Sequence, residues 1–330
     1  MQPPGPDELD AIAARVLENI ARDEASPSDL VFLLRHYSAS ERDDIADALG
    51  EALAAALGQY ALEPTVEGRA SWLSLFCAAI ECSDDERLQS AAGFLIGSLR
   101  RDDPRPAGVV EACASIEACL RASALGDAQE IVSEAVDELE HVIGHAYKPG
   151  AGIVGGDLRD HARAAATLLT AHEITGRLPY AMLAEELMQS AKRLAWSTSG
   201  FAANCEAARV LCRLAALHAD EEYQRAAVIA ADANYRADAA RVLAAQAPHA
   251  RGKDAAEFGL ALGEYLALTI ESPDTYGHRS RAARSRPEEH RHTAQDRLDS
   301  IDVGIGERSS DELLLDGRPH GGAVFRRDAL

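Results

Sequence analysis

The segment from Gly68 to Ala227 repeats one unit that consists of two helices. Each unit has an apolar helix rich in small residues, a turn near Gly or Asp, and then a strongly amphipathic helix. The unit recurs about every 40 to 50 residues, a period typical of helical solenoids, toroids and arrays. The repeat therefore predicts an all-α protein, and it leaves the chemistry open.

The two kinds of helix predict two layers. A helix that is apolar on all sides must be surrounded, whereas a helix with one apolar stripe lies at the surface. The apolar helices begin near residues 28, 68, 108, 157, 203 and 254. Each of the first five is followed by an amphipathic partner, the last of them from Glu221 to about Gln246.

The sixth apolar helix, Lys253 to Ile270, has no partner after it, but an amphipathic helix, Asp7 to Arg22, precedes the first unit. If that helix packs beside Lys253 to Ile270, it completes an outer ring around an inner ring, which is an (α/α)6 toroid. The alternative is an open superhelix of the tetratricopeptide or HEAT type. The tighter periods and consensus residues of those repeats are not found here.

Residues 1–276 are expected to form the toroid domain, and residues 277–330 a disordered tail. The tail is rich in Arg, His, Ser and Glu and has no apolar periodicity, so it cannot offset the entropy cost of folding. Four arginines at 279, 281, 284 and 286 could dock an acidic protein partner. The alternative is a solvated tail without a partner.

The net charge of −21 argues against nucleic acid and anionic membranes as partners, because both need a basic face. The apolar runs are too short to span a bilayer, and the acidic, Pro-rich N-terminus does not resemble a signal peptide. The six cysteines form no CxxC pair, so we expect reduced thiols in the cytoplasm.

The sequence indicates no cofactor and no metal ion. The glycine-rich segment 147–156 lacks the preceding strand and the Gly-Lys-Ser/Thr ending of a phosphate-binding loop, so a flexible loop is expected instead. His141 and His145 are spaced to share a helix face, but no third ligand is apparent.

Two stretches resemble a known family. One is GGDLRDHARAA (155–165) followed by LLTAHEITGRLPY (168–180), and the other is STSGFAAN (197–204) leading into LCRLAALHADEEY (211–223). They resemble hairpins of the six-hairpin glycosidase-like superfamily. The likeness is nearest to the toroid domain of thioredoxin-fused, spermatogenesis-associated-type proteins, and more distant to N-acylglucosamine 2-epimerases.

The likeness covers about residues 145 to 230. Asp160 and His161 fall on the Asp-Tyr pair of the family pattern, with His161 in place of the Tyr, and Asn204 falls on the Asn of the family's Ser-Gly-Asn entry. The resemblance implies a toroid of helical hairpins with a carbohydrate as ligand.

The architecture predicts a site at the rim where the inner helices begin. Their free N–H groups and positive dipole ends converge there, and the longer loops surround them. Asp160 and Glu206 are the two carboxylates that a glycosidase would need, and His161 is the candidate acid or base near neutral pH. The structural alternative is that Asp157 and Asp160 only cap a helix.

Further side chains are candidates for ligand binding. Trp72 and Trp196 could stack on a sugar ring or simply fill an alanine-rich ring. Arg209 shares a helix face with Glu206, so these charges could bind a ligand or pair with one another. The candidate ligand-binding residues are Trp72, Asp157, Trp196, Asn204 and Arg209.

Two function classes remain open. One is a non-catalytic helical scaffold with carbohydrate as its ligand, which the low aromatic content favours. The other is a carbohydrate-active enzyme, a sugar epimerase, isomerase or glycosidase relative. The glycine-rich loops and the polar starts of the inner helices favour the enzyme.

Overall fold

The computed structural model describes residues 3–101, 106, 108–125, 128–194, 196, 199–226, 233–252 and 254–270. The tail expected from Gly277 onward lies outside these residues. The described elements, in chain order, are α1 (Asp7–Ala21), α2 (Pro27–Ser40), α3 (Asp43–Ala56), η1 (Tyr60–Leu62), α4 (Val66–Ile80), α5 (Glu86–Arg101), α6 (Val109–Ala122), η2 (Ser123–Leu125), α7 (Ala128–Ala146), β1 (Tyr147–Lys148), β2 (Gly152–Ile153), α8 (Leu158–Thr175), α9 (Leu178–Ala191), α10 (Phe201–Ala219), α11 (Glu221–Ala226), α12 (Tyr235–Gln246), η4 (Ala247–His249) and α13 (Ala255–Ile270). The prediction of an all-α protein is confirmed.

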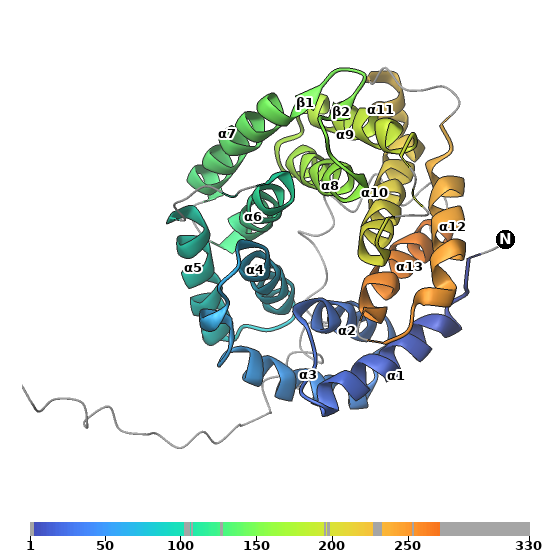
Figure 1. Cartoon of the computed structure of the whole chain (residues 1–330). Helices are drawn as coiled ribbons and strands as arrows, with labels where there is room; N and C mark the ends of the chain where they lie inside the picture. Colours follow the sequence, from blue (N-terminus) through green and yellow to red (C-terminus); the bar gives the residue numbers. More distant parts are fainter. Residues whose placement is uncertain are drawn as a thin grey trace, which may run out of the picture. The chain divides into compact units, whose positions relative to one another are not determined.

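The helices lie in two layers (Figure 1). Helices α2, α4, α6, α8, α10 and α13 surround the centre, and each contacts the next in this order. The inner layer also contacts itself at its ends, because α13 packs against α2. The remaining α-helices lie on the outside of this inner layer.

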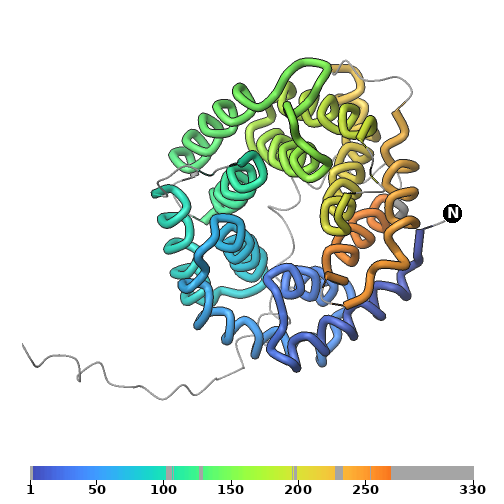
Figure 2. Tube along the Cα trace, in the orientation of Figure 1, coloured from blue at the N-terminus to red at the C-terminus, as the bar shows by residue number. Residues whose placement is uncertain are grey.

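The two ends of the described chain meet. Helix α1 packs against both α13 and α2, and Arg15 Nη1 donates a hydrogen bond to the carbonyl oxygen of Ala250 at 2.9 Å. Figure 2 shows the blue N-terminal helix beside the orange helices at the end of the described chain. The contact expected between the first and the last helix is therefore present.

Local sequence explains where several inner helices begin. Ser26 and Asp29 form a capping box at α2, and the Thr65 hydroxyl accepts from the Gly68 N–H at α4. The outer helices bury one stripe, as in α5, whose buried residues are Leu88, Ala91, Ala92, Leu95, Ile96 and Leu99. No helix in the described part of the chain is both long enough and apolar enough to cross a membrane.

The inner helices differ from the prediction that they are apolar on all sides. Each packs against neighbouring helices, but the residues that these helices turn toward the central cavity include Arg, Glu and Ser. On α6, for example, Glu117 and Arg121 line a central cavity. A charge is tolerated there because the cavity admits water and because opposite charges come from neighbouring helices.

Two local predictions need correction. The single helix expected from Glu221 to Gln246 is interrupted, because residue 233 is not helical and the Asn234 side chain caps α12 by accepting from the Ala237 N–H at 3.0 Å. The loop expected to be flexible between α7 and α8 instead forms the antiparallel pair β1–β2. Gly152 in this pair has φ +77°, and a Cβ there would collide with the ring of His161.

Candidate functional site

A cavity of about 530 Å³ lies among the inner helices. Its lining includes residues from α2, α4, α6, α8, α10 and α13, so every inner helix contributes to it. A volume of this size falls within the range of small-molecule binding sites. The cavity is therefore the best candidate for a functional site among the described residues.

Helices α2 and α4 give the cavity a wall of hydroxyl groups. Ser38, Ser71 and Ser74 line it, and each hydroxyl donates to a carbonyl oxygen one turn earlier in its own helix at 2.9 Å. A hydroxyl that donates in this way keeps its oxygen lone pairs as acceptors. These hydroxyl groups are uncharged, and the same two helices also bring Arg35 and Glu67 into the lining.

Next to α4 along the inner layer, α6 and α8 form a charged cluster around Glu117. Arg121 Nη2 donates to Glu117 Oε1 at 2.8 Å, and Arg163 Nη1 lies 3.5 Å from Glu117 Oε2. Burial alone would raise the pKa of Glu117. The positive charges of Arg121, Arg163 and Arg213 outweigh burial and hold that pKa well below its ordinary value.

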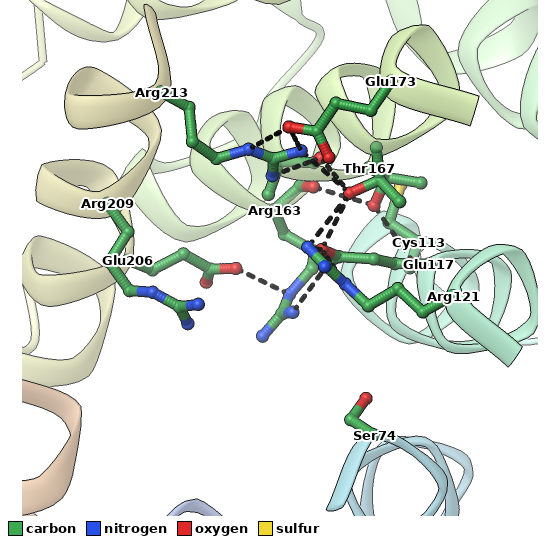
Figure 3. Close-up of polar contacts among 12 residues, drawn as sticks. Ser74, Cys113, Glu117, Arg121, Arg163, Thr167, Glu173, Glu206, Arg209 and Arg213 are labelled. Atoms are coloured by element: carbon green, nitrogen blue, oxygen red, sulfur yellow. Dashed lines mark hydrogen bonds and ion pairs between the residues drawn. The ribbon is translucent and has the colours of Figure 1, made fainter. Parts of the chain in front are cut away.

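Glu206 of α10 belongs to the same cluster. Its Oε1 lies 2.9 Å from Arg163 Nε, so Arg163 joins Glu206 to Glu117. Figure 3 shows Arg163 directed from α8 between these two carboxylates. Burial raises the pKa of Glu206, and the attraction of Arg163 offsets this only in part. The two glutamates therefore have pKa shifts of opposite sign.

A second cluster joins α2, α10 and α13. Glu264 Oε1 accepts from Arg35 Nη1 at 2.8 Å and from Arg209 Nε and Nη2 at 3.0 and 2.9 Å. Burial lowers the pKa of Arg35, and the positive charges of Arg209 and Arg121 lower it further. The carboxylate of Glu264 thus accepts hydrogen bonds from two guanidinium groups.

The charges on α10 pair with other helices and not with one another. Arg209 pairs with Glu264, Arg213 Nη2 donates to Glu173 Oε1 at 2.9 Å, and Glu206 pairs with Arg163. Arg213 also donates to the Thr170 hydroxyl at 3.0 Å. These contacts fix the register between α10 and its neighbours.

Asp157 and Asp160 form a capping box at the start of α8. Asp157 Oδ1 accepts from the N–H groups of Arg159 and Asp160 at 2.7 and 3.2 Å, and Asp160 Oδ2 accepts from the Asp157 N–H at 2.9 Å. The structural alternative considered for these residues accounts for their contacts. Neither is among the residues that line the cavity.

His161 and Asn204 are buried and hydrogen-bonded to backbone. His161 Nδ1 lies 2.7 Å from the Asp157 carbonyl oxygen, to which it donates, and Nε2 accepts from the Ile153 N–H at 3.1 Å. Asn204 Nδ2 donates to the carbonyl oxygens of Trp196, Ser199 and Gly200 at 3.3, 3.2 and 3.1 Å. Both side chains hold the segments before α8 and α10 in place.

The two tryptophans also lie away from the cavity lining. Trp72 is buried in the core beside Phe76, with ring centroids 6.1 Å apart. Trp196 is partly buried and donates from Nε1 to the Ala191 carbonyl oxygen at 2.6 Å. Of the eight candidate residues, Arg209 lines the cavity, and Glu206 reaches its charged cluster through Arg163.

Sequence reasoning missed most of the charged residues around the cavity. These are Arg35, Glu117, Arg121, Arg163 and Glu264. Glu117 and Arg121 stand at i and i+4 in an otherwise apolar helix, and Arg35 interrupts the apolar run LVFLLRHY. Burying an isolated charge in such a helix is costly unless the charge has a partner or contacts water. These charges were therefore the sequence signal that could have indicated a polar cavity.

No group of three or more metal-ligating side chains occurs in the described ranges. The His145 Nδ1 lies 2.8 Å from the His141 carbonyl oxygen, one turn earlier in α7. Burial raises the pKa of Cys77, which lines the cavity, and of Cys113 to about 12, so neither thiol is a nucleophile near neutral pH.

Comparison of the chain with protein-family models, with curated proteins and with solved structures gave no match. The chemistry of the cavity is therefore inferred from its own residues.

Proposed function

We propose that the described helices form an (α/α)6 toroid whose central cavity binds a small hydroxylated molecule, with carbohydrate as the ligand class. The packing of α13 against both α1 and α2 supports a closed ring, because an open superhelix would separate its first and last helices. The motif resemblance to the six-hairpin glycosidase-like superfamily supports the same arrangement.

The polar lining of the cavity is the main support for carbohydrate as the ligand class. Sugars present many hydroxyl groups, and each hydroxyl both donates and accepts a hydrogen bond. The cavity offers guanidinium donors on Arg35, Arg121 and Arg209, and it offers acceptors on Glu117 and on the serine hydroxyls of α2 and α4. Recognition would rest on these hydrogen bonds, since both tryptophans lie outside the lining.

Binding without catalysis is the first proposal. The residues expected to catalyse at the rim, Asp160 and His161, use their polar atoms to hold the start of α8. A general acid or base needs an atom that is available to the substrate. The six free cysteines support the cytoplasmic location expected from the sequence, and the strongly acidic composition supports the absence of nucleic-acid and membrane partners.

A carbohydrate-active enzyme is the second candidate, and one observation favours it. Glu117 and Glu206 share Arg163, and their pKa values are shifted in opposite directions. Two carboxylates with pKa values driven apart are typical of a base and an acid in one site. In such an enzyme Glu117, which lines the cavity, would accept a proton, and Glu206, which lies behind Arg163, would donate one once Arg163 moves aside.

Binding is tested by isothermal titration calorimetry of the full chain against a panel of monosaccharides and disaccharides. Ser74→Leu places a larger side chain into the cavity without removing a charge, and Ser133→Leu makes the same change on an exposed position of α7. We expect binding by the wild type and by Ser133→Leu, and its loss in Ser74→Leu. Binding that persists in Ser74→Leu, or the failure of every sugar to bind, would contradict the proposal.

Catalysis is tested on any sugar that binds. Proton NMR of the sugar incubated with the chain detects epimerisation, isomerisation or hydrolysis directly. The enzyme candidate predicts turnover that is lost in Glu206→Gln while binding is retained. Binding without any turnover would leave the non-catalytic proposal standing.

A further inference from the structure

We infer that the cavity holds an anion-binding centre formed by Arg35, Arg121 and Arg209, and that its ligand is a sugar carrying a carboxylate or phosphate group. This inference rests on the proposed function, because it specifies the ligand class of the same cavity. Neutral sugars would bind at most weakly.

The first support is that arginines outnumber their carboxylate partners. Arg35 and Arg209 both bond to one oxygen of Glu264, Oε1, at 2.8 to 3.0 Å. The other oxygen, Oε2, is buried and has no hydrogen-bond partner within the described part of the chain. A guanidinium that satisfies a carboxylate commonly bonds to both of its oxygens, so this pairing leaves donors of both arginines unused.

Carboxylates are shared between arginines elsewhere around the cavity too. The ion pairs there join five arginines to four glutamates. The arginines are Arg35, Arg121, Arg163, Arg209 and Arg213, and the glutamates are Glu117, Glu173, Glu206 and Glu264. The lining also holds Glu67, Glu81 and Glu257, so the cavity as a whole is not positive and the anion-binding centre is local to its arginines.

The second support is that the arginine donors are accessible and converge. Arg35 and Arg121 line the cavity and keep 48% and 36% of their side-chain surface exposed. Figure 3 shows Arg121 and Arg209 directed from α6 and α10 toward one space, with Ser74 of α4 across it. Burial and the repulsion of Arg209 and Arg121 lower the pKa of Arg35, whereas neighbouring carboxylates outweigh burial and raise the pKa values of Arg121 and Arg209. A bound anion would relieve the repulsion at Arg35.

Three carboxylates that pair with none of the five arginines in the described ranges also line the cavity, namely Glu67, Glu81 and Glu257. Glu67 and Glu257 lie in the first turns of α4 and α13, and Glu67 already pairs with Arg159. Glu257 precedes Glu264 by seven residues, which is about 10 Å along a helix. Burial alone would lower the pKa of Arg209, and the charges of Glu264 and Glu257 raise it. The carboxylate oxygens of Glu257 can accept from sugar hydroxyls while the arginines hold the acidic group.

Calorimetry with four probes separates the possibilities. The probes are glucose, glucuronate, glucose 6-phosphate and inorganic phosphate, each titrated into the full chain. We expect glucuronate or glucose 6-phosphate to bind at least about tenfold more tightly than glucose, and the difference to shrink as salt is raised. The carboxylate and phosphate arms show which acidic group the centre prefers.

Variants then assign the effect to the arginines. Arg35→Gln should weaken binding of the acidic sugar about tenfold or more, since one charge-assisted hydrogen bond is lost, and should leave glucose nearly unchanged. Arg35→Lys should retain more affinity than Arg35→Gln. Arg100→Gln removes a positive charge from the outer helix α5 and should change nothing. Helical circular dichroism checks folding, and Arg121→Gln gives the same measurement if Arg35→Gln fails to fold.

The outcomes distinguish the two proposals. If glucose binds as tightly as the acidic sugars, or Arg35→Gln weakens all probes equally, the anion centre is wrong and the carbohydrate proposal stands. If inorganic phosphate binds in an Arg35-dependent way and no sugar binds, the carbohydrate proposal is wrong and the anion centre stands. If no probe binds, both are overturned.

Discussion

Glu117 and Glu206 allow the same substitution to be made on both sides of one arginine. Glutamine is close to glutamate in shape and removes only the charge. Both carboxylates are largely buried, with 12% and 13% of the side chain exposed, and both contact Arg163. Because their pKa values are shifted in opposite directions, the two variants should differ in stability.

Glu117→Gln should be strongly destabilising near neutral pH. It leaves Arg121 without a carboxylate and deprives Arg163 of one of its two. Removing one partner of a buried ion pair costs about 3 to 5 kcal/mol, and because the arginines border a cavity that admits water we expect the lower end, about 3 kcal/mol. For a domain of this size that corresponds to a fall in Tm of about 6 to 12 °C.

Glu206→Gln should cost much less. The pKa of Glu206 is raised mainly by burial, so its charged form is less favourable in the folded state than in the unfolded chain. A neutral glutamine avoids that cost, although it weakens the contact with Arg163, and we expect a change within about 1 kcal/mol.

The stability of each variant relative to the wild type should change with pH in a different way. The folded-state pKa of Glu117 lies below its ordinary value of 4.5, so its contribution is present above that value and is lost as the pH falls through the folded-state pKa. The difference between wild type and Glu117→Gln should therefore persist from neutral pH down to about pH 5 and shrink in stronger acid. The folded-state pKa of Glu206 lies above 4.5, so the wild type should lose stability relative to Glu206→Gln as the pH rises through that range.

Urea unfolding followed by circular dichroism measures these differences at several pH values. The double variant Glu117→Gln with Arg121→Gln provides a further check. Removing both partners should cost less than the sum of the single changes, because no uncompensated charge remains. Equal destabilisation by Glu117→Gln and Glu206→Gln at neutral pH would refute the reasoning from burial and charge.

Three further predictions concern the region around α8 and the buried thiols. Gly152→Ala should be more destabilising than Gly150→Ala in thermal unfolding, because both glycines have positive φ but only at Gly152 would the new methyl collide with His161; equal losses would contradict this. Asp160→Asn should leave any sugar binding intact, since Asp160 acts in a helix cap; loss of binding with the fold retained would place the site at the rim where α8 begins. Cys113 should resist labelling by a thiol reagent near neutral pH until the chain unfolds, because burial raises its pKa to about 12, and rapid labelling of the native chain would contradict this.

Helix positions could be read closely from the sequence because the signal for a helix is local. The expected helix Asp7 to Arg22 is α1, Asp7–Ala21, and the expected Leu158 to Ile174 is α8, Leu158–Thr175. The apolar spacing and the capping residues that define such elements lie within a few residues of one another. The interruption before α12 was missed because Asn234 is a weak signal within an alanine-rich stretch.

The polar contacts of the cavity could not be predicted in this way. Arg35 and Glu264 are 229 residues apart in the chain, and their pairing depends on the packing of α2 against α13. Local spacing instead suggested that Glu206 and Arg209 pair with each other on α10. The structure joins each of them to a different helix, Glu206 to Arg163 on α8 and Arg209 to Glu264 on α13.

The ion pairs also make the cavity asymmetric. They cross the helix contacts from α2 through α13, α10 and α8 to α6, by way of Glu264, Arg163 and their partners. Helix α4 faces the same cavity mainly with small residues, Ala70, Ser71, Ser74, Cys77 and Ala78. A ligand with one acidic end and one hydroxylated end has one favourable orientation in such a space, with its charge toward the arginines and its hydroxyls toward α4. The layout of charges, more than the shape of the cavity, would then decide which molecules bind.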